Sequence, residues 1–108
     1  MIYTVQEIQS RVMPVAKKYG IKAVFLFGSY AKGTATEDSD IDLLIDTSGT
    51  ALRSLLSLGA LYNDLEAVLE KKIDLITIRS LEQRTQIPSE AAFREAVMKE
   101  RVRLYDVA

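Results

Sequence analysis

The chain has 108 residues, of which 48% are hydrophobic and 27% charged, and its formal net charge is −1. This size and composition predict one soluble domain over residues 1–108, with enough apolar surface for a single core. Cysteine and histidine are both absent from the sequence, which excludes disulfides, thiol nucleophiles, histidine bases and nearly every zinc site. Any catalysis must therefore use carboxylates, hydroxyls and amines.

The charge balance also limits the partners. The 14 basic and 15 acidic residues give no net field that would attract a nucleic acid backbone. No uncharged apolar run approaches the ~20 residues that a membrane-spanning helix needs. We therefore expect a cytoplasmic protein that makes no direct contact with nucleic acid or membrane.

Residues 5–19 predict the first helix. Thr4 and Glu7 form a capping-box pattern, and Gly20 is a suitable terminator. The apolar positions at helical spacing are Val5, Ile8, Val12, Val15 and Tyr19. Pro14 removes one backbone hydrogen bond inside this segment, so we expect a kink or a break into two pieces there.

Two short strands follow the first helix. Residues 23–27 are aromatic and aliphatic and end at Gly28, which predicts a strand buried on both faces. Residues 41–45 predict the second strand, closed by turn-forming residues at 46–49. The residues 29–39 between them are mostly small and polar, which predicts a loop with room for one helical turn.

The second half predicts a long helix over 52–69, a strand over 73–78, a helix that Pro88 and Ser89 open, and a short final strand over 102–107. Periodicity does not separate the core leucines of the long helix from leucines exposed for a partner. The order of elements predicts an α+β fold with a small mixed sheet flanked by helices.

The segment 28–46, GSYAKGTATEDSDIDLLID, carries the candidate chemistry. A Walker A loop is excluded because Thr34 stands where its lysine should be. An EF-hand loop is excluded because Leu43 occupies the obligatory glycine position. A third motif fits throughout: Gly28 and Ser29 at a strand end, then ten residues, then Asp-x-Asp on the next strand.

Asp40 and Asp42 are two residues apart, so on a strand they project to one face while Ile41 faces the core. Residues 37–46 include five acids and no basic residue, and such a cluster would repel a polyphosphate unless divalent cations neutralise it. Magnesium, which prefers oxygen ligands, is the natural ion. Asp46 shares the parity of Asp42 but is expected to serve a turn.

Asp74 supplies a third acid. It is a lone carboxylate in an apolar strand, where burial would be costly unless the charge is paired or binds metal. We expect its strand to lie next to the strand that follows Asp40. Three acids match a two-metal site, in which Asp40 and Asp42 bridge two Mg²⁺ ions and Asp74 holds the ion that activates an attacking hydroxyl.

Four further residues are candidates for nucleotide binding. Gly28 would let the backbone approach a phosphate, and the Ser29 hydroxyl and the amides after it would hold the β and γ phosphates. Lys32 is either a surface lysine or a phosphate contact. Ser39 is more typical of a turn than of a ligand.

The pattern GSYAKG followed by SDIDLLID resembles the signature of the DNA polymerase β-like nucleotidyltransferase superfamily, in particular its minimal nucleotidyltransferases (MNT) of the MntA antitoxin type. The first helix, the long central helix, the KKIDLIT strand and the LYD ending also fall in the order of that family. One departure is Lys32, where this branch often has arginine, which would give bidentate phosphate geometry.

The resemblance implies a polymerase β-like palm core that transfers AMP from ATP, with Mg²⁺, to a tyrosine hydroxyl of a partner HEPN-domain toxin. The chain would then be an antitoxin that forms a hetero-oligomer with the toxin. The docking face would include residues 34–38 and part of the leucine-rich helix. Two alternatives remain: an antitoxin that acts by contact alone, and a nucleotidyltransferase for small molecules, which would need an acceptor domain that 108 residues do not accommodate.

Overall fold

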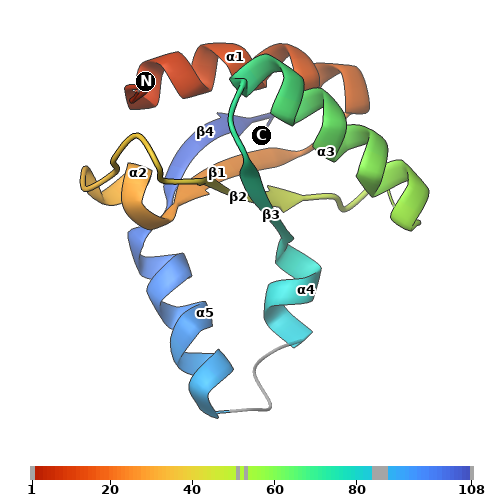
Figure 1. Ribbon diagram of the computed structural model, residues 1–108. Helices are drawn as coiled ribbons and strands as arrows, with labels where there is room; N and C mark the ends of the chain where they lie inside the picture. The colour runs from red at the N-terminus through yellow and green to blue at the C-terminus, as the bar shows by residue number, and fades with distance from the viewer. Residues whose placement is uncertain (1, 51, 53, 84–87, 108) are drawn as a thin grey trace.

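The computed structural model describes residues 2–50, 52, 54–83 and 88–107, and places a four-stranded sheet between helices (Figure 1). The elements in chain order are α1 (Val5–Tyr19), β1 (Ala23–Phe27), α2 (Gly28–Lys32), β2 (Ile41–Asp46), α3 (Leu55–Leu69), β3 (Ile73–Thr77), α4 (Ile78–Gln83), α5 (Pro88–Glu100) and β4 (Val102–Asp106). No helix of this described part is long and apolar enough to cross a bilayer.

The sheet has the strand order β3-β2-β1-β4. β1 pairs antiparallel with β2 and with β4, whereas β2 and β3 run parallel. A parallel pair needs a crossover, and α3 provides it by returning the chain from the end of β2 to the start of β3. The mixed sheet, the final strand and the neighbouring placement of β2 and β3 are confirmed.

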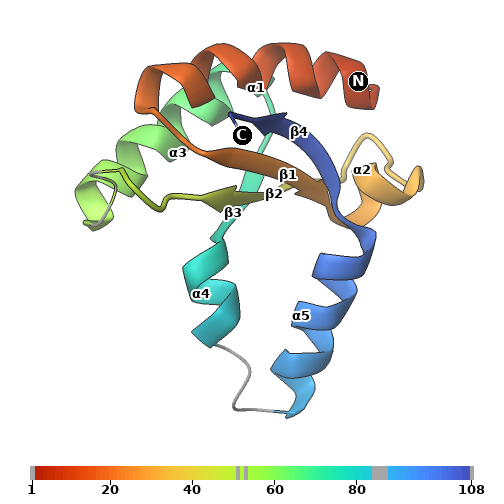
Figure 2. The same ribbon diagram turned by 180° about the vertical axis from the view of Figure 1, so that it is seen from behind.

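Helices cover both faces of the sheet. α1 and α3 lie on one face, and α4 and α5 extend from the other, as the two opposite views show (Figures 1 and 2). Under α1 and α3, Ile41, Leu43 and Ile45 of β2 join the larger buried cluster, while Leu44 joins a smaller cluster on the other face. All of β1 is buried, as its apolar sequence predicts.

The first helix is a single element, so the expected break into two pieces is wrong. Thr4 and Glu7 form the predicted capping box, and Gly20 ends the helix in the left-handed conformation with φ 66°. Pro14 is exposed and lies inside α1. The buried residues before and after it, Val12 and Val15 among them, keep both halves of the helix on the core.

Two helix boundaries differ from the prediction. α3 begins at Leu55 and not near residue 52, because Ser54 caps it and forms a capping box with Ser57. α4 was not predicted, since Ile78 continues the apolar run of β3 in the sequence. The chain turns there instead: the Thr77 hydroxyl accepts a hydrogen bond from the Ser80 backbone N–H (3.0 Å), and Leu81 is buried.

Candidate active site

The three candidate acids meet at one end of the sheet. The antiparallel register sets Phe27, the last residue of β1, opposite Asp42 near the start of β2. The parallel register sets Asp42 beside Asp74 on β3, and Asp40 lies directly before β2. Residues separated by more than thirty positions are thus brought together by strand pairing, as the sequence predicted.

Asp42 and Asp74 face the side of the sheet from which α4 and α5 extend. Side chains alternate along a strand, and the flanking residues of both acids pack under α1 and α3: Ile41, Leu43, Ile73 and Leu75. Asp42 is half-buried, whereas Asp40 and Asp74 are exposed. The expectation that Asp74 is buried in its strand is therefore wrong, because β3 is an edge strand and Asp74 lies near its first residue.

The three carboxylates make no hydrogen bond or ion pair with any described residue. Burial, and after it the negative charges of Asp74 and Asp40, together raise the pKa of Asp42 to about 6. Both causes disfavour the charged form of the carboxylate. The site is therefore a group of acidic side chains that the described chain leaves without an ion pair.

Gly28 is required here by a close approach. Its φ is 72°, in the left-handed region, and a Cβ at this position would overlap the Asp42 carboxylate and lie 2.9 Å from Asp42 Cγ. The glycine therefore makes room for the acid, and the approach of a phosphate at this position stays a prediction. Ser29 follows in the first turn of α2, and its hydroxyl makes no hydrogen bond with the described residues.

The two weaker nucleotide-binding candidates have partners within the protein. Lys32, at the end of α2, forms an exposed ion pair with Glu100 of α5 (Nζ to Oε2, 3.3 Å). The Ser39 hydroxyl accepts a hydrogen bond from the Thr36 backbone N–H (2.8 Å), which is a turn contact. Both residues can reach a nucleotide only by giving up or sharing these contacts.

Two residues that the sequence analysis did not place at the site lie near it. The Tyr62 hydroxyl of α3 donates to the Ile73 carbonyl oxygen (3.2 Å), and its pKa is raised by burial, by Glu66 and by the charges of Asp40 and Asp74. Lys71 Nζ donates to the carbonyl oxygen of Glu37 (2.7 Å) and ties the loop before Asp40 to the start of β3. A tyrosine in a leucine-rich stripe was the one available signal, because its hydroxyl needs a partner.

The donor set fits magnesium chemically. Carboxylate oxygens are hard ligands of the kind that Mg²⁺ prefers, and a cation would relieve the repulsion that raises the pKa of Asp42. Within the described ranges, no three acidic side chains are grouped closely enough to hold one ion together. The backbone thus brings the acids to one end of the sheet, while their side chains do not converge on a single point.

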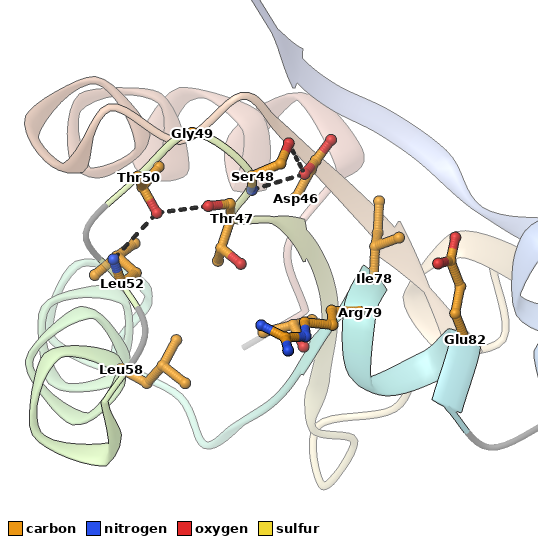
Figure 3. A pocket seen from close by; sticks show the side chains of 11 residues that line it. Asp46, Thr47, Ser48, Gly49, Thr50, Leu52, Leu58, Ile78, Arg79 and Glu82 are labelled. Atoms are coloured by element: carbon orange, nitrogen blue, oxygen red, sulfur yellow. Dashed lines mark hydrogen bonds between the residues drawn. The ribbon is translucent and has the colours of Figure 1, made fainter.

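Two hollows lie at opposite ends of the sheet. One, of about 530 Å³, is beside Asp40 and is lined by residues of the preceding loop and by Lys71 and Lys72. The other, of about 460 Å³, is formed by residues 46–50, α3 and the start of α4, with Arg79 reaching into it (Figure 3). The second hollow contains none of the three candidate acids, so it is a separate feature from the candidate active site.

The chain belongs to the nucleotidyltransferase domain family, which matches residues 14–104. This range contains the Gly-Ser pair, all three acids and every strand of the sheet up to Leu104. The family resemblance that the glycine–serine and Asp-x-Asp spacing indicated is confirmed.

Individual relatives narrow the class. Protein adenylyltransferase MntA of Thermococcus cleftensis is 39% identical over 83 residues, which cover 72% of this chain and 81% of that protein. A crystal structure of a toxin–antitoxin with AMP-PNP has a TM-score of 0.69 at 20% identity, covering 92% of this chain and 73% of that chain. A tri-AMPylated Shewanella oneidensis HEPN toxin in complex with an MNT antitoxin has a TM-score of 0.63 at 18% identity, covering 96% and 74%. These likenesses confirm the fold class, a polymerase β-like nucleotidyltransferase core.

Proposed function

We propose that the chain is a Mg²⁺-dependent nucleotidyltransferase that transfers AMP from ATP to a tyrosine hydroxyl of a partner HEPN-domain toxin, with which it forms a hetero-oligomer. The observation that carries the proposal is the group of three carboxylates, without an ion pair among the described residues, at the strand end that Gly28 and Ser29 follow. Acids that are held together without partners mark a site for ligand chemistry. The adenylyltransferase relative and the AMP-PNP complex support AMP as the group transferred.

Asp40, Asp42 and Asp74 would hold two Mg²⁺ ions. When bound, the ions would neutralise the polyphosphate and lower the pKa of the attacking hydroxyl. The Ser29 hydroxyl and the backbone N–H groups of the first turn of α2 would orient the β and γ phosphates beside Gly28. The tyrosine hydroxyl would then lose its proton to solvent, its oxygen would form a bond to the α-phosphorus, the bond between this phosphorus and the bridging oxygen would break, and pyrophosphate would leave.

The acceptor would be presented by the partner. The loop that leads to Asp40 is held by Lys71 through the Glu37 carbonyl oxygen, and the partner would dock on this loop beside the acids. Docking supplies orientation, for which effective molarities correspond to about 7–11 kcal/mol of barrier. Transfer to free small alcohols should consequently be negligible. The HEPN–MNT complex is the support for this choice of partner.

Co-expression with the partner toxin and measurement of its intact mass tests the proposal. The wild-type chain should add one or more AMP units to the toxin, and Asp42→Asn should add none. Asp46→Asn is the matched control, since it removes an acid at the other end of the same strand, where Ser48 bonds the carboxylate, and it should leave transfer intact. An unmodified toxin that is nevertheless neutralised would establish the contact-only alternative, and a modified small molecule would establish the third function.

A further inference from the structure

Gly59 lies in the middle of α3, where no contact among the described residues requires a glycine. Glycine in a helix interior costs about 1 kcal/mol relative to alanine, so it usually has a packing reason. A Cβ at Gly59 would meet no atom within 4 Å, and its φ is not in the left-handed region. Neither packing among the described residues nor backbone conformation therefore requires the glycine. The open space above it is available to something outside the chain.

Two leucines one turn before Gly59 are exposed to solvent. Leu55 is 90% exposed and Leu56 is 88% exposed, whereas Leu58 is partly buried and Leu61, Leu65 and Leu69 are buried. A hollow of about 260 Å³ adjoins them, lined by Leu55, Leu58, Gly59, Tyr62, Leu75 and Thr77. The structure thus distinguishes the core leucines of α3 from its exposed leucines, which periodicity alone did not do. The exposed leucines at the start of α3 form an apolar protrusion next to an apolar hollow.

The free edge of β3 borders the same hollow. β3 is the outermost strand of the sheet, beside β2. The Lys72 carbonyl oxygen accepts from the Ile41 N–H, so the alternating backbone groups of Ile73 and Leu75 point away from β2. The Tyr62 hydroxyl satisfies the Ile73 carbonyl. The backbone N–H and C=O groups of Leu75 therefore remain at the sheet edge, where another chain can form hydrogen bonds with them.

We propose that this face, formed by Leu55, Leu56, Gly59, Tyr62 and Leu75, binds a second copy of the chain, with α3 crossing α3 at Gly59 about a twofold axis. A protrusion and a hollow side by side on one face are the condition for an isologous contact, in which each copy inserts into the other. The glycine of each helix lets the two helices approach closely, and the exposed leucines of one copy fill the hollow of the other.

Charge favours a second copy as the occupant. A twofold contact brings identical side chains near one another, and like charges would oppose it. The ten residues from Ser54 to Asn63 include no charged side chain, although 27% of the chain is charged. The face also leaves the acids open, because Asp42 and Asp74 project from the opposite face of the sheet. The proposal therefore stands independently of the proposed function.

Sedimentation velocity of the purified chain over a range of concentrations tests the contact. The wild type should sediment as a dimer of the 12.1 kDa chain, and Leu56→Asp should raise the dissociation constant at least tenfold. Aspartate in the first turn favours helix formation, so this variant should stay folded. Ala92→Asp, an equal charge change at an exposed site of α5, should leave the dimer unchanged.

Gly59→Glu distinguishes loss of contact from loss of folding. Glutamate is a better helix former than glycine and its Cβ meets open space. At a concentration low enough for the wild type to be monomeric, the variant should therefore unfold at the same or a higher temperature, while at high concentration it should form no dimer. A wild-type chain that is monomeric at every concentration would overturn the proposal, and so would a dimer that survives Gly59→Glu. A face that is filled only by a different, co-purified protein would overturn it as well.

Discussion

β2 carries an aspartate near each end, and the two carboxylates lie in opposite environments. Asp46 closes the strand, and its carboxylate accepts hydrogen bonds from the Ser48 N–H (3.0 Å) and the Ser48 hydroxyl (2.7 Å). Asp42, four residues earlier on the same side of the strand, makes no hydrogen bond with the described residues. Burial acts to raise the pKa of both acids, but the Ser48 bonds and Lys22 lower that of Asp46, whereas Asp74 and Asp40 add to the rise at Asp42.

The difference shows which of the two carboxylates has its hydrogen bonds satisfied within the protein. Asp46 is satisfied by its own turn, and the turn role that the sequence suggested is what its contacts support. Asp42 has two other acids and a glycine as its neighbours, and the glycine is there to admit the carboxylate. A half-buried acid without a partner destabilises a fold unless a ligand uses it. We therefore interpret the start of β2 as the functional end of the strand.

The largest expected effect is on transfer. Asp42→Asn should lower the rate of AMP transfer about 10³-fold or more, because the metal-binding charge it removes is worth several kcal/mol in the transition state. Asp46→Asn removes an equal charge from the same strand and should change the rate less than about threefold. The accumulation of modified partner over time, followed by intact mass, measures both. Equal losses in the two variants would remove the distinction between the ends of β2.

Asp74→Asn should separate turnover from binding. Asp74 lies on a different strand from the other two acids, where it would serve the hydroxyl-activating ion more than the nucleotide. We expect turnover to fall about 100-fold and ATP affinity to change less than about threefold. Single-turnover kinetics and calorimetric ATP titration provide the two values. Wild-type turnover in this variant would make Asp74 a structural acid.

Gly28→Ala should destabilise the fold by about 1–3 kcal/mol, through its positive φ and the overlap with Asp42. Gly20→Ala is a matched control, because Gly20 has a similar φ of 66° and a Cβ there meets nothing within 4 Å. The excess loss at Gly28 measures the close approach of Asp42. Urea unfolding gives both free energies, and equal losses would show that the approach costs nothing.

The pH dependence of stability should differ in sign for the two acids. The native pKa of Asp42, about 6, lies above its usual value of 3.8, so the native state binds more protons between these values and the unfolding free energy falls as pH rises through them. Partial exposure limits this loss to about 1–2 kcal/mol. The pKa of Asp46 is lowered, so its contribution is present above pH 4 and is lost as pH falls.

Urea unfolding of the metal-free protein at pH 4, 5 and 7 checks this prediction. Asp42→Asn should be the more stable protein at pH 7 and should lose that advantage at pH 4. Asp46→Asn should be less stable than the wild type at pH 7 and close to it at low pH. Parallel pH profiles for the two variants would contradict the assigned environments.

Local patterns in the sequence were sufficient for much of this account. Capping residues and apolar runs predicted α1, β1, β2 and α5, and the spacing of Gly28, Ser29, Asp40 and Asp42 predicted the acid end of the sheet. The predictions that were wrong or missing depended on contacts between residues distant in sequence or on a local turn. The exposure of Asp74 follows from its edge position, which a strand pattern does not reveal, and α4 follows from a turn at Thr77 inside an unbroken apolar run.

The hydrogen bonds that support the site could not be predicted from hydrophobic periodicity either. Lys71 fitted the end of a helix in the sequence, but its bond to the Glu37 carbonyl oxygen requires the loop before Asp40 to lie beside β3. Tyr62 fitted an apolar stripe, and only the packing of α3 on β3 brings its hydroxyl to the Ile73 carbonyl. Such pairings are set by tertiary packing, which a single sequence does not specify.

Calorimetric titration of ATP into the purified wild-type chain, with Mg²⁺ and with a chelator in its place, tests the central claim most directly. Three carboxylates that form no ion pair with the described residues should repel the polyphosphate unless divalent cations are present. We predict saturable ATP binding with Mg²⁺ and at least a tenfold weaker interaction in the chelator. ATP binding that is undiminished in the chelator would contradict the assignment of Asp40, Asp42 and Asp74 as a metal-dependent nucleotide site.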